Sequence, residues 1–182
     1  VVALPPTTGG QLTAMLQGLV SRYKFGGSVK NKAANIAYGI NIFAGQGAIT
    51  LDGRYSPGKD CDGFTCSTIV AETFRLFGFD LVDLRTWDEK PVNKIWGDAV
   101  ICMLQADGAE AAHVAAVKRN NKGLRLRPEE VAAAGEKFAP GLPLAYADVD
   151  DRAAEIVQEM TAACGAPPPA HQKMKNCADA YY

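Results

Sequence analysis

Residues 60–78 read DCDGFTCSTIVAETFRLFG, in which a short polar segment with a cysteine leads into an amphipathic stretch. The apolar residues of this stretch recur at helical spacing, and Gly78 is placed to end the helix. The sequence therefore predicts a helix over 62–77, with Cys61 directly before its first turn. A cysteine in that place can act as a nucleophile, because the aligned peptide dipoles of a helix favour a thiolate at its N-terminus.

A catalytic thiolate needs a proton acceptor that later protonates the leaving group, and histidine is the usual choice. The chain contains two histidines. His171 lies in a Pro-rich tail, whereas His113 begins the apolar segment HVAAV, which we expect to be a strand. His113 is therefore the predicted base for Cys61.

The patterns outside this stretch predict an α+β domain in which helices precede and follow a small sheet. Helical spacing of apolar residues predicts two helices before Cys61, at 11–24 and 31–43. Three short segments predict an antiparallel sheet, at 97–104, 113–119 and 124–127. Two further helices are predicted after the sheet, at 128–138 and 148–164.

The composition is that of an ordinary globular protein, with 182 residues of which 48% are hydrophobic and 21% charged. This length predicts a single domain over 1–164, followed by a Pro-rich tail over 165–182. The net charge of −1 gives no reason to expect a nucleic-acid partner, and no apolar run is long enough to span a bilayer. The start, VVALPPTTGG, lacks a signal-peptide pattern, so either a leader was removed or the chain is a fragment.

The five cysteines allow two bridges and one free thiol in an oxidising compartment, or five reduced thiols. A bridge between Cys164 and Cys177 would staple the tail, and a bridge between Cys66 and Cys102 is the other pairing considered. The chain has two histidines and no C-x-x-C pair, so no zinc site is expected. No other cofactor is expected either.

Three short motifs carry a resemblance to a known family: RYKFGGS, DCDGF, and the pair WGDAVICML and HVAAV. In this order they resemble the Y-x-W-G-G-x-S element, the D-C-S-G-[FL]-V motif and the paired strands of the NlpC/P60 cell-wall peptidases. The resemblance covers residues 22–127. It implies a papain-like α+β fold, in which the nucleophile lies at the N-terminus of a helix packed on a small antiparallel sheet.

The same resemblance implies a cysteine peptidase or amidase that cleaves peptidoglycan stem peptides at a γ-D-glutamyl amide bond. Cys61 is then the nucleophile that forms an acyl-enzyme, and His113 is the general base. Tyr23 and Asp60 match positions that bind the free amine of the substrate in many family members. Asp62 replaces a family serine, and it either stabilises the start of the helix or binds a positive group on the substrate.

The chain departs from the family at the residue that orients the histidine. The family places a polar residue on the next strand, where this chain has Arg125 and Arg127. A guanidinium has no acceptor for the imidazole N–H, so neither arginine can do this. The candidates that remain are Asn120, Asn121, Glu129, Glu130, a backbone carbonyl and water.

The compact single domain resembles the amidases that bacteria inject into the periplasm of rivals by type VI secretion. This implies an enzyme that is secreted or delivered to the bacterial periplasm or cell wall, and an immunity protein that plugs its cleft. A papain-like deamidase, protease or acyltransferase toxin acting on proteins uses the same cysteine and histidine. A binding module that has lost catalysis is the third alternative, and the lack of a clear third residue is its best support.

Overall fold

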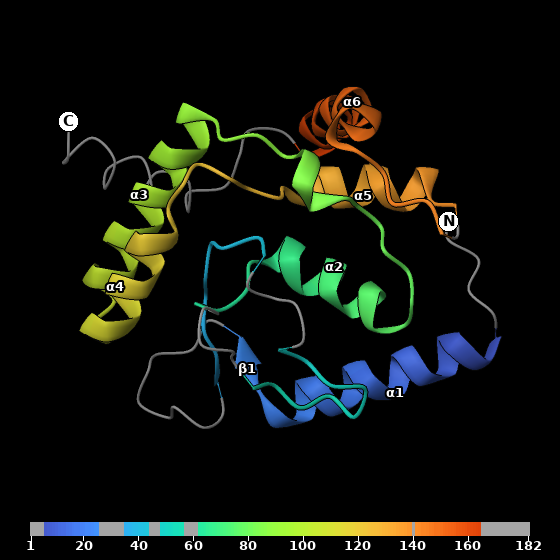
Figure 1. The fold of residues 1–182 in the computed structure, drawn as a ribbon, viewed down its shortest axis with the longest axis horizontal. Coiled ribbons are helices and arrows are strands. Elements are labelled where there is room, and N and C mark those ends of the chain that lie inside the picture. Colours follow the sequence, from blue (N-terminus) through green and yellow to red (C-terminus); the bar gives the residue numbers. More distant parts are fainter. Residues whose placement is uncertain (1–5, 26–34, 44–47, 57–61, 140, 165–182) are drawn as a thin grey trace.

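The structure is a computed structural model that describes residues 6–25, 35–43, 48–56, 62–139 and 141–164. Within these residues the regular secondary structure is predominantly helical (Figure 1). The strands described there are two residues long, and β1 (Lys24–Phe25) pairs in parallel with β2 (Asn35–Ile36). The predicted α+β papain-like fold is therefore wrong, because the described residues contain no antiparallel sheet for the helix to pack on.

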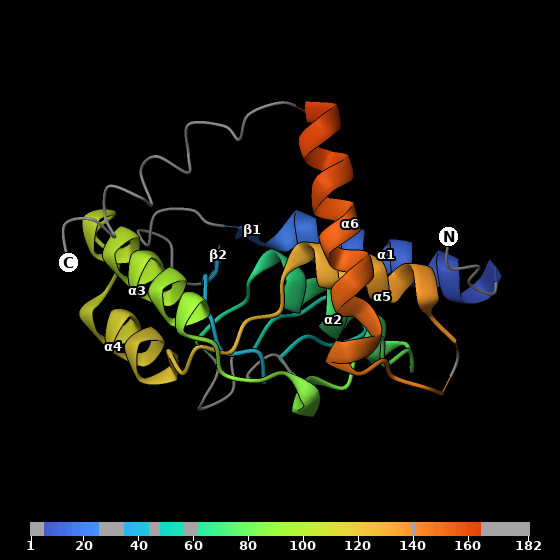
Figure 2. The same cartoon turned by 90° about the horizontal axis from the view of Figure 1, so that it is seen from above.

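The central element is α2, with other helices on three sides of it (Figure 1). The N-terminal helix α1 lies along one side, α5 and α6 lie on the opposite side, and α3 and α4 form a hairpin at one end. Seen from above, α6 crosses α5 steeply and extends beyond the rest of the fold (Figure 2). The bounds of these helices are α1 Pro6–Arg22, α2 Cys66–Leu76, α3 Pro91–Ala106, α4 Ala111–Asn120, α5 Pro128–Lys137 and α6 Tyr146–Cys164.

The two longer predicted strands are helices. Residues 97–104 lie inside α3, which begins with Pro91 at its first position, where a proline costs no hydrogen bond. Residues 113–119 lie inside α4, whose buried residues Val114 and Val117 are three apart, as one helix face requires. The third predicted strand, 124–127, is extended chain with no partner strand among the described residues.

The predicted helix 31–43 is also wrong where the structure describes it, since residues 35–43 contain β2 and extended chain. Three other predicted helices are confirmed. They correspond to 11–24, 128–138 and 148–164, and they are present as α1, α5 and α6.

The helix that follows the cysteine motif begins at Cys66, four residues later than predicted. Thr65 caps it: its Oγ1 accepts a hydrogen bond from the backbone N–H of Thr68 at 3.1 Å, and its own N–H donates to Thr68 Oγ1 at 2.8 Å. This reciprocal capping box satisfies two backbone donors at the helix start. Asp62 therefore precedes the helix rather than beginning it.

Three separate apolar clusters make up the core, and we name them by the helices that surround them. The α1 core contains Met15 and Leu19, the α3–α4 core contains Val100 and Val117, and the α5–α6 core is the largest. The buried members of the α5–α6 core are Ile42, Leu81, Trp87, Leu126, Val131, Ala133, Ala134, Val149, Ala153 and Ile156.

One extended segment, residues 36–43, connects the three cores. Ile36 belongs to the α1 core, Ile40 to the α3–α4 core and Ile42 to the α5–α6 core. All three side chains are buried. The segment thus runs through the middle of the molecule, and its backbone reaches both α2 and α4.

The described helices include none that combines the length and the apolar composition needed to cross a membrane. This agrees with the sequence, which predicts no membrane span.

Candidate functional site

The candidate site lies where the 36–43 segment passes between the start of α2 and helix α4. Tyr38 pairs with Phe64 as a parallel β-bridge. The Phe64 N–H donates to the carbonyl of Ala37 at 3.0 Å, and the Gly39 N–H donates to the carbonyl of Phe64 at 3.3 Å. Phe64 lies between the two cysteines of the DCDGFTC motif, so these bonds attach that motif to the 36–43 segment.

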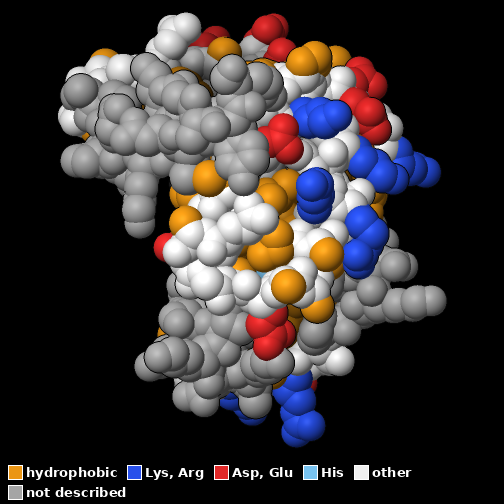
Figure 3. All heavy atoms as spheres, turned by 90° about the vertical axis from the view of Figure 1, so that its left-hand side faces the viewer, with side chains coloured by type: hydrophobic (Ala, Val, Ile, Leu, Met, Phe, Trp, Pro, Cys, Tyr) orange, Lys and Arg blue, Asp and Glu red, His pale blue; other side chains and the backbone are white. Residues whose placement is uncertain are grey.

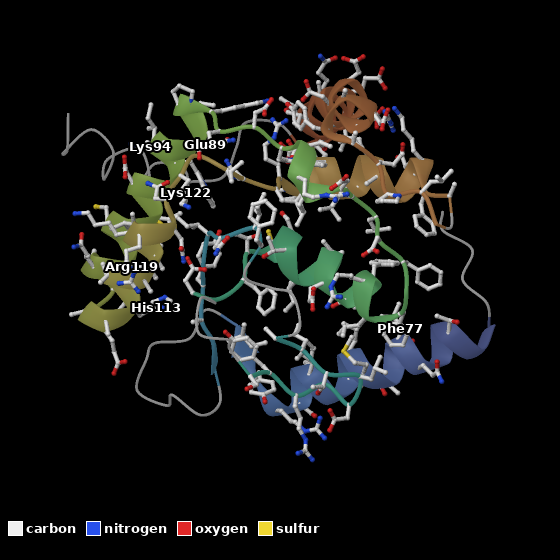
Figure 4. The ribbon with its side chains drawn as sticks, viewed as in Figure 1. Phe77, Glu89, Lys94, His113, Arg119 and Lys122 are labelled. Carbon is white, nitrogen blue, oxygen red and sulfur yellow. The ribbon has the colours of Figure 1, made fainter. Side chains whose placement is uncertain are left out.

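His113 is attached to the same segment from the other side. Its Nε2 lies 3.1 Å from the carbonyl oxygen of Tyr38, and Figure 4 shows the side chain extending from α4 towards that part of the chain. A carbonyl oxygen only accepts hydrogen bonds, so Nε2 carries the proton in this contact. In the neutral ring, Nδ1 is then the basic nitrogen. A backbone carbonyl thus orients His113, which is one of the candidates that the sequence left open.

Asp62 is buried, with 2% of its surface exposed, and it ties this region to α4. Its carboxylate accepts hydrogen bonds from the Asn120 side chain at 3.1 Å and from the backbone N–H groups of Ile40 and Asn41 at 3.4 Å each. Burial raises the pKa of Asp62 above its ordinary value, and the hydrogen bond from Asn120 opposes that rise. Because the carboxylate is covered and already bonded, this geometry favours a structural role over contact with substrate.

Two glycines allow the motif and the 36–43 segment to approach so closely. Gly63 has a φ of 118°, and a Cβ there would lie 2.1 Å from the carbonyl oxygen of Ala37. A Cβ on Gly39 would lie 2.4 Å from Oδ1 of Asp62. Both distances are well inside van der Waals contact, so a side chain at either position would push the two segments apart.

Cys66 has the position that the sequence assigned to Cys61. It is the first residue of α2, and its side chain is exposed. Among the described residues, the backbone N–H groups of Cys66 and Ser67 have no hydrogen-bond acceptor, as is usual for the first turn of a helix. Such N–H groups can stabilise an oxyanion that forms next to the thiol.

Tyr38 stands between the reactive groups of this region. Burial raises the pKa of its hydroxyl above the ordinary value; the Cys66 thiol adds to this rise and the Arg125 guanidinium opposes it. The hydroxyl of Tyr38 makes no hydrogen bond to any described residue.

The remaining predicted site residues fall into two groups. Cys61 and Asp60, the predicted nucleophile and its neighbour, lie outside the described residues. Tyr23 lies beside the α1 core, where its hydroxyl accepts a hydrogen bond from the backbone N–H of Tyr55 at 3.0 Å. The ring of Tyr55 contacts the ring of Phe64 with centroids 5.7 Å apart, which is the structural connection between Tyr23 and the motif.

Of the two predicted disulfides, the structure describes both cysteines of one and a single cysteine of the other. No bond joins Cys66 to Cys102. Cys164 ends α6 with an exposed side chain, and its predicted partner Cys177 lies outside the described residues, as does His171.

Four basic residues of α3, of α4 and of the turn after α4 lie at the surface. Lys94, Lys118, Arg119 and Lys122 are exposed, and Figure 3 shows lysines and arginines gathered along one side of the face that these helices form. Figure 4 shows Lys94, Arg119 and Lys122 on the same outer part of the hairpin. We call these four residues the basic face.

Residues Tyr38 and Cys66 are the functional candidates that the sequence argument missed. A cap signal could have identified Cys66, because Thr65 directly before the periodic residues is a preferred N-cap. Nothing in the local sequence marks Tyr38, whose importance comes from the chain that it pairs with. Among the residues that the structure describes, no group of His, Cys, Asp or Glu is arranged to hold a metal ion.

Comparison with known proteins gives no match to any family model, any curated protein or any solved structure. The resemblance to the NlpC/P60 family therefore rests on the three motifs alone. What the chain does has to be inferred from Cys66, His113 and the segment that connects them.

Proposed function

We propose that this protein is a cysteine hydrolase that cleaves amide bonds of peptidoglycan stem peptides, with a γ-D-glutamyl bond as the target. The observation that carries the proposal is the contact of His113 with the carbonyl of Tyr38, at 3.1 Å. Tyr38 is itself paired with Phe64, three residues after Cys61 and two before Cys66. An oriented imidazole and a cysteine-bearing turn are thus attached to one short piece of backbone.

Two cysteines compete for the role of nucleophile. Cys61 is the one that the motif favours, and it lies outside the described residues. Cys66 is the one that the geometry favours, because it begins α2, is exposed, and has beside it two N–H groups that make no hydrogen bond to the described residues. We assign the nucleophile to Cys66 and keep Cys61 as the alternative.

The chemistry follows from these positions. Nδ1 of His113 takes the proton of the Cys66 thiol. The thiolate attacks the amide carbonyl, and the resulting oxyanion accepts hydrogen bonds from the N–H groups of Cys66 and Ser67. Nδ1 of His113 gives a proton to the leaving amine as the C–N bond breaks and the acyl-enzyme forms. The same nitrogen then takes a proton from the water that hydrolyses the thioester, and it returns that proton to the Cys66 sulfur as the C–S bond breaks.

The substrate class rests on the motifs and on charge. The basic face would attract a polymer that carries many carboxylates, and this attraction weakens as ionic strength rises. A cell-wall substrate also fits delivery to the bacterial periplasm, with an immunity protein as the natural inhibitor. An enzyme with the same cysteine and histidine acting on proteins is the alternative that a substrate test must separate.

The decisive experiment is digestion of purified peptidoglycan followed by mass spectrometry of the released fragments. Wild type is compared with Cys66→Ala, Cys61→Ala and His113→Ala, and Cys164→Ala serves as the matched control because its thiol is exposed at the far end of α6. We expect Cys66→Ala and His113→Ala to lose hydrolysis by several orders of magnitude. The control should keep wild-type activity.

Each other outcome has a definite meaning. If Cys61→Ala is inactive and Cys66→Ala is active, the function stands and the motif has identified the nucleophile. A further outcome is that neither the wild type nor any variant releases fragments although iodoacetamide alkylates Cys66 rapidly at neutral pH. In that case the thiol is reactive and the substrate is not peptidoglycan. If Cys66 and Cys61 are both unreactive, the chain is a binding module.

A further inference from the structure

An apolar groove lies between α2 and α5, and the proposed nucleophile is part of its wall. The groove has a volume of about 370 Å³. Cys66, Val70 and Phe74 line it from α2, and because they are four residues apart they share one face of that helix. Figure 1 shows α5 beside α2, with both helices beginning at the end that faces the α3–α4 hairpin. We call this cavity the α2–α5 groove.

The facing wall of the α2–α5 groove comes from α5. Its lining residues are three or four apart along that helix: Pro128, Val131, Ala132 and Gly135. Leu81, which is buried, also lines the groove. No charged side chain is among the described residues that line it, so the groove suits an uncharged, apolar occupant.

The polar side chains of the groove are confined to one end. Among the described lining residues only Cys66 and Ser67 have polar side-chain atoms, and Cys66 Sγ lies 3.9 Å from Ser67 Oγ. Both residues begin α2, and Phe74 lies roughly 12 Å further along the helix. The groove can therefore hold a carbonyl group at Cys66 and an alkyl chain of about eight carbons beyond it.

Gly135 leaves space in the α5 wall of the groove. A Cβ on Gly135 would meet no heavy atom within 4 Å outside its own stretch of helix. Alanine would thus fit there, although glycine is the less favourable of the two in a helix interior. A longer side chain at position 135 would fill part of the groove.

We infer that the α2–α5 groove binds the alkyl chain of a fatty acyl group that Cys66 accepts from a medium-chain acyl thioester. The thiolate attacks the thioester carbonyl, the bond from Sγ to carbon forms, and the bond from carbon to the leaving sulfur breaks. The leaving thiolate takes up a proton, which balances the one that Cys66 lost. The inference rests on Cys66 as the nucleophile and goes beyond the proposed function, because this acyl group, unlike a γ-D-glutamyl group, carries no charge.

The first test measures how fast Cys66 reacts with N-alkylmaleimides of increasing chain length. Mass mapping of the alkylated peptides gives the rate at Cys66 relative to Cys164, an exposed thiol at the far end of α6, in the same reaction. Full burial of a methylene favours binding about fourfold, and a groove open to solvent on one side should provide about twofold. From N-methylmaleimide to N-heptylmaleimide, the relative rate at Cys66 should therefore rise about 60-fold.

A variant that fills the groove should remove this dependence. In Gly135→Leu we expect the rise to fall below about fivefold, whereas Gly135→Ala should keep most of it. Gly10→Leu is the matched control, because Gly10 lies in α1 with the same open surroundings and does not line the groove. Ala132→Leu places a second bulky side chain on the same wall and replaces Gly135→Leu if thermal melting shows that variant to be unfolded.

The second test measures acyl transfer with p-nitrophenyl acetate and p-nitrophenyl octanoate, which also differ by six methylenes. We expect kcat/KM for release of p-nitrophenolate to be about 60-fold higher for the octanoate in the wild type. Mass spectrometry of the intact protein should show the octanoyl group on Cys66. Cys66→Ala should lose the release, and Gly135→Leu should lose the preference.

The outcomes separate this inference from the proposed function. Chain-length dependence in both tests supports the acyl site even if purified peptidoglycan is not digested. Relative rates at Cys66 that do not change with chain length overturn it, which includes the case in which another part of the chain covers the groove. A preference for octanoate that persists in Cys66→Ala or in Gly135→Leu also overturns it, and digestion of peptidoglycan would still support the hydrolase.

Discussion

Replacing Asp62 by asparagine tests whether this buried carboxylate fixes the motif to the 36–43 segment and α4. One carboxylate oxygen accepts from Ile40 and Asn120, and the other accepts from Asn41. An asparagine keeps one acceptor and replaces the other by an NH₂ group, so at least one buried donor faces another donor. Loss of a hydrogen bond to a charged acceptor costs about 1.5–3 kcal/mol.

Two features reduce this figure. The bonds from Ile40 and Asn41 are long, at 3.4 Å each, so each contributes less than a short bond. A neutral amide also avoids the burial cost that raises the pKa of Asp62. We therefore expect Asp62→Asn to lower the free energy of unfolding by about 1–2 kcal/mol, which corresponds to a fall in Tm of roughly 2–8 °C in a chain of this size.

The pH dependence has a definite sign. Because the pKa of Asp62 is raised in the folded state, the folded protein binds the proton more tightly than the unfolded chain does. Between the ordinary pKa of 3.8 and the raised one, the contribution of Asp62 to stability falls as pH rises, and it is constant outside that window. The variant lacks this slope. The difference in Tm between wild type and Asp62→Asn should thus be larger in acid than at neutral pH.

The assay is thermal unfolding followed by circular dichroism from acid to neutral pH. Asp88→Asn is the control, because Asp88 is exposed and its loss should change Tm little at any pH. The double variant Asp62→Asn with Asn120→Asp returns an acid–amide pair and should recover part of the loss. An unchanged Tm for Asp62→Asn, or a loss that grows towards neutral pH, would refute this account of Asp62.

Three further substitutions test other parts of the fold by thermal unfolding. Gly63→Ala should lower the free energy of unfolding by about 3 kcal/mol or more, because the new Cβ would clash with backbone atoms. Gly78 has a φ of 81° with open space around it, so Gly78→Ala should lower the free energy of unfolding by only about 1 kcal/mol. Equal losses in the two variants would count against the close approach of Gly63 to the 36–43 segment. Thr65→Ala should cost about 0.5–2 kcal/mol through loss of the α2 cap, and Thr65→Ser should restore most of it. Trp87→Phe should lower the free energy of unfolding by about 1–3 kcal/mol, because the buried Glu130 loses its 3.0 Å hydrogen bond from the indole N–H. A Tm equal to that of the wild type would contradict this role of Trp87.

The helical half of the fold could be predicted because its apolar residues repeat over long windows. The helices α1 and α6 have 17 and 19 residues, which is long enough for a clear period, and the start of α5 is marked by Pro128 with Glu129 and Glu130 in its first turn. The α3–α4 hairpin was predicted as strands because eight-residue apolar runs, such as 97–104, do not distinguish a buried strand from a buried helix. Extending the window back to Pro91 and noting the spacing of Val114 and Val117 would have favoured helices.

The site was predictable only in part. His113 and the cysteine motif are indeed connected, but through the carbonyl of Tyr38 rather than through a neighbouring strand. Sequence patterns report which residues share a face of one element, and this contact joins residues 75 positions apart. The burial of Asp62 could not be predicted for the same reason, because its hydrogen-bond partners belong to α4 and to the 36–43 segment, which are distant in sequence.

The passage of the 36–43 segment through all three cores links the site to the cooperativity of unfolding. Ile36, Ile40 and Ile42 each anchor a different core, so no one of these cores can open without releasing its hold on that segment. Regions of this kind exchange their backbone amides only when the whole molecule unfolds. The amide of Gly39, bonded to Phe64, should therefore be among the slowest to exchange in the chain. The geometry of the candidate site and the global stability of the fold should then change together, and a variant that weakens any one core should also loosen the acceptor that orients His113.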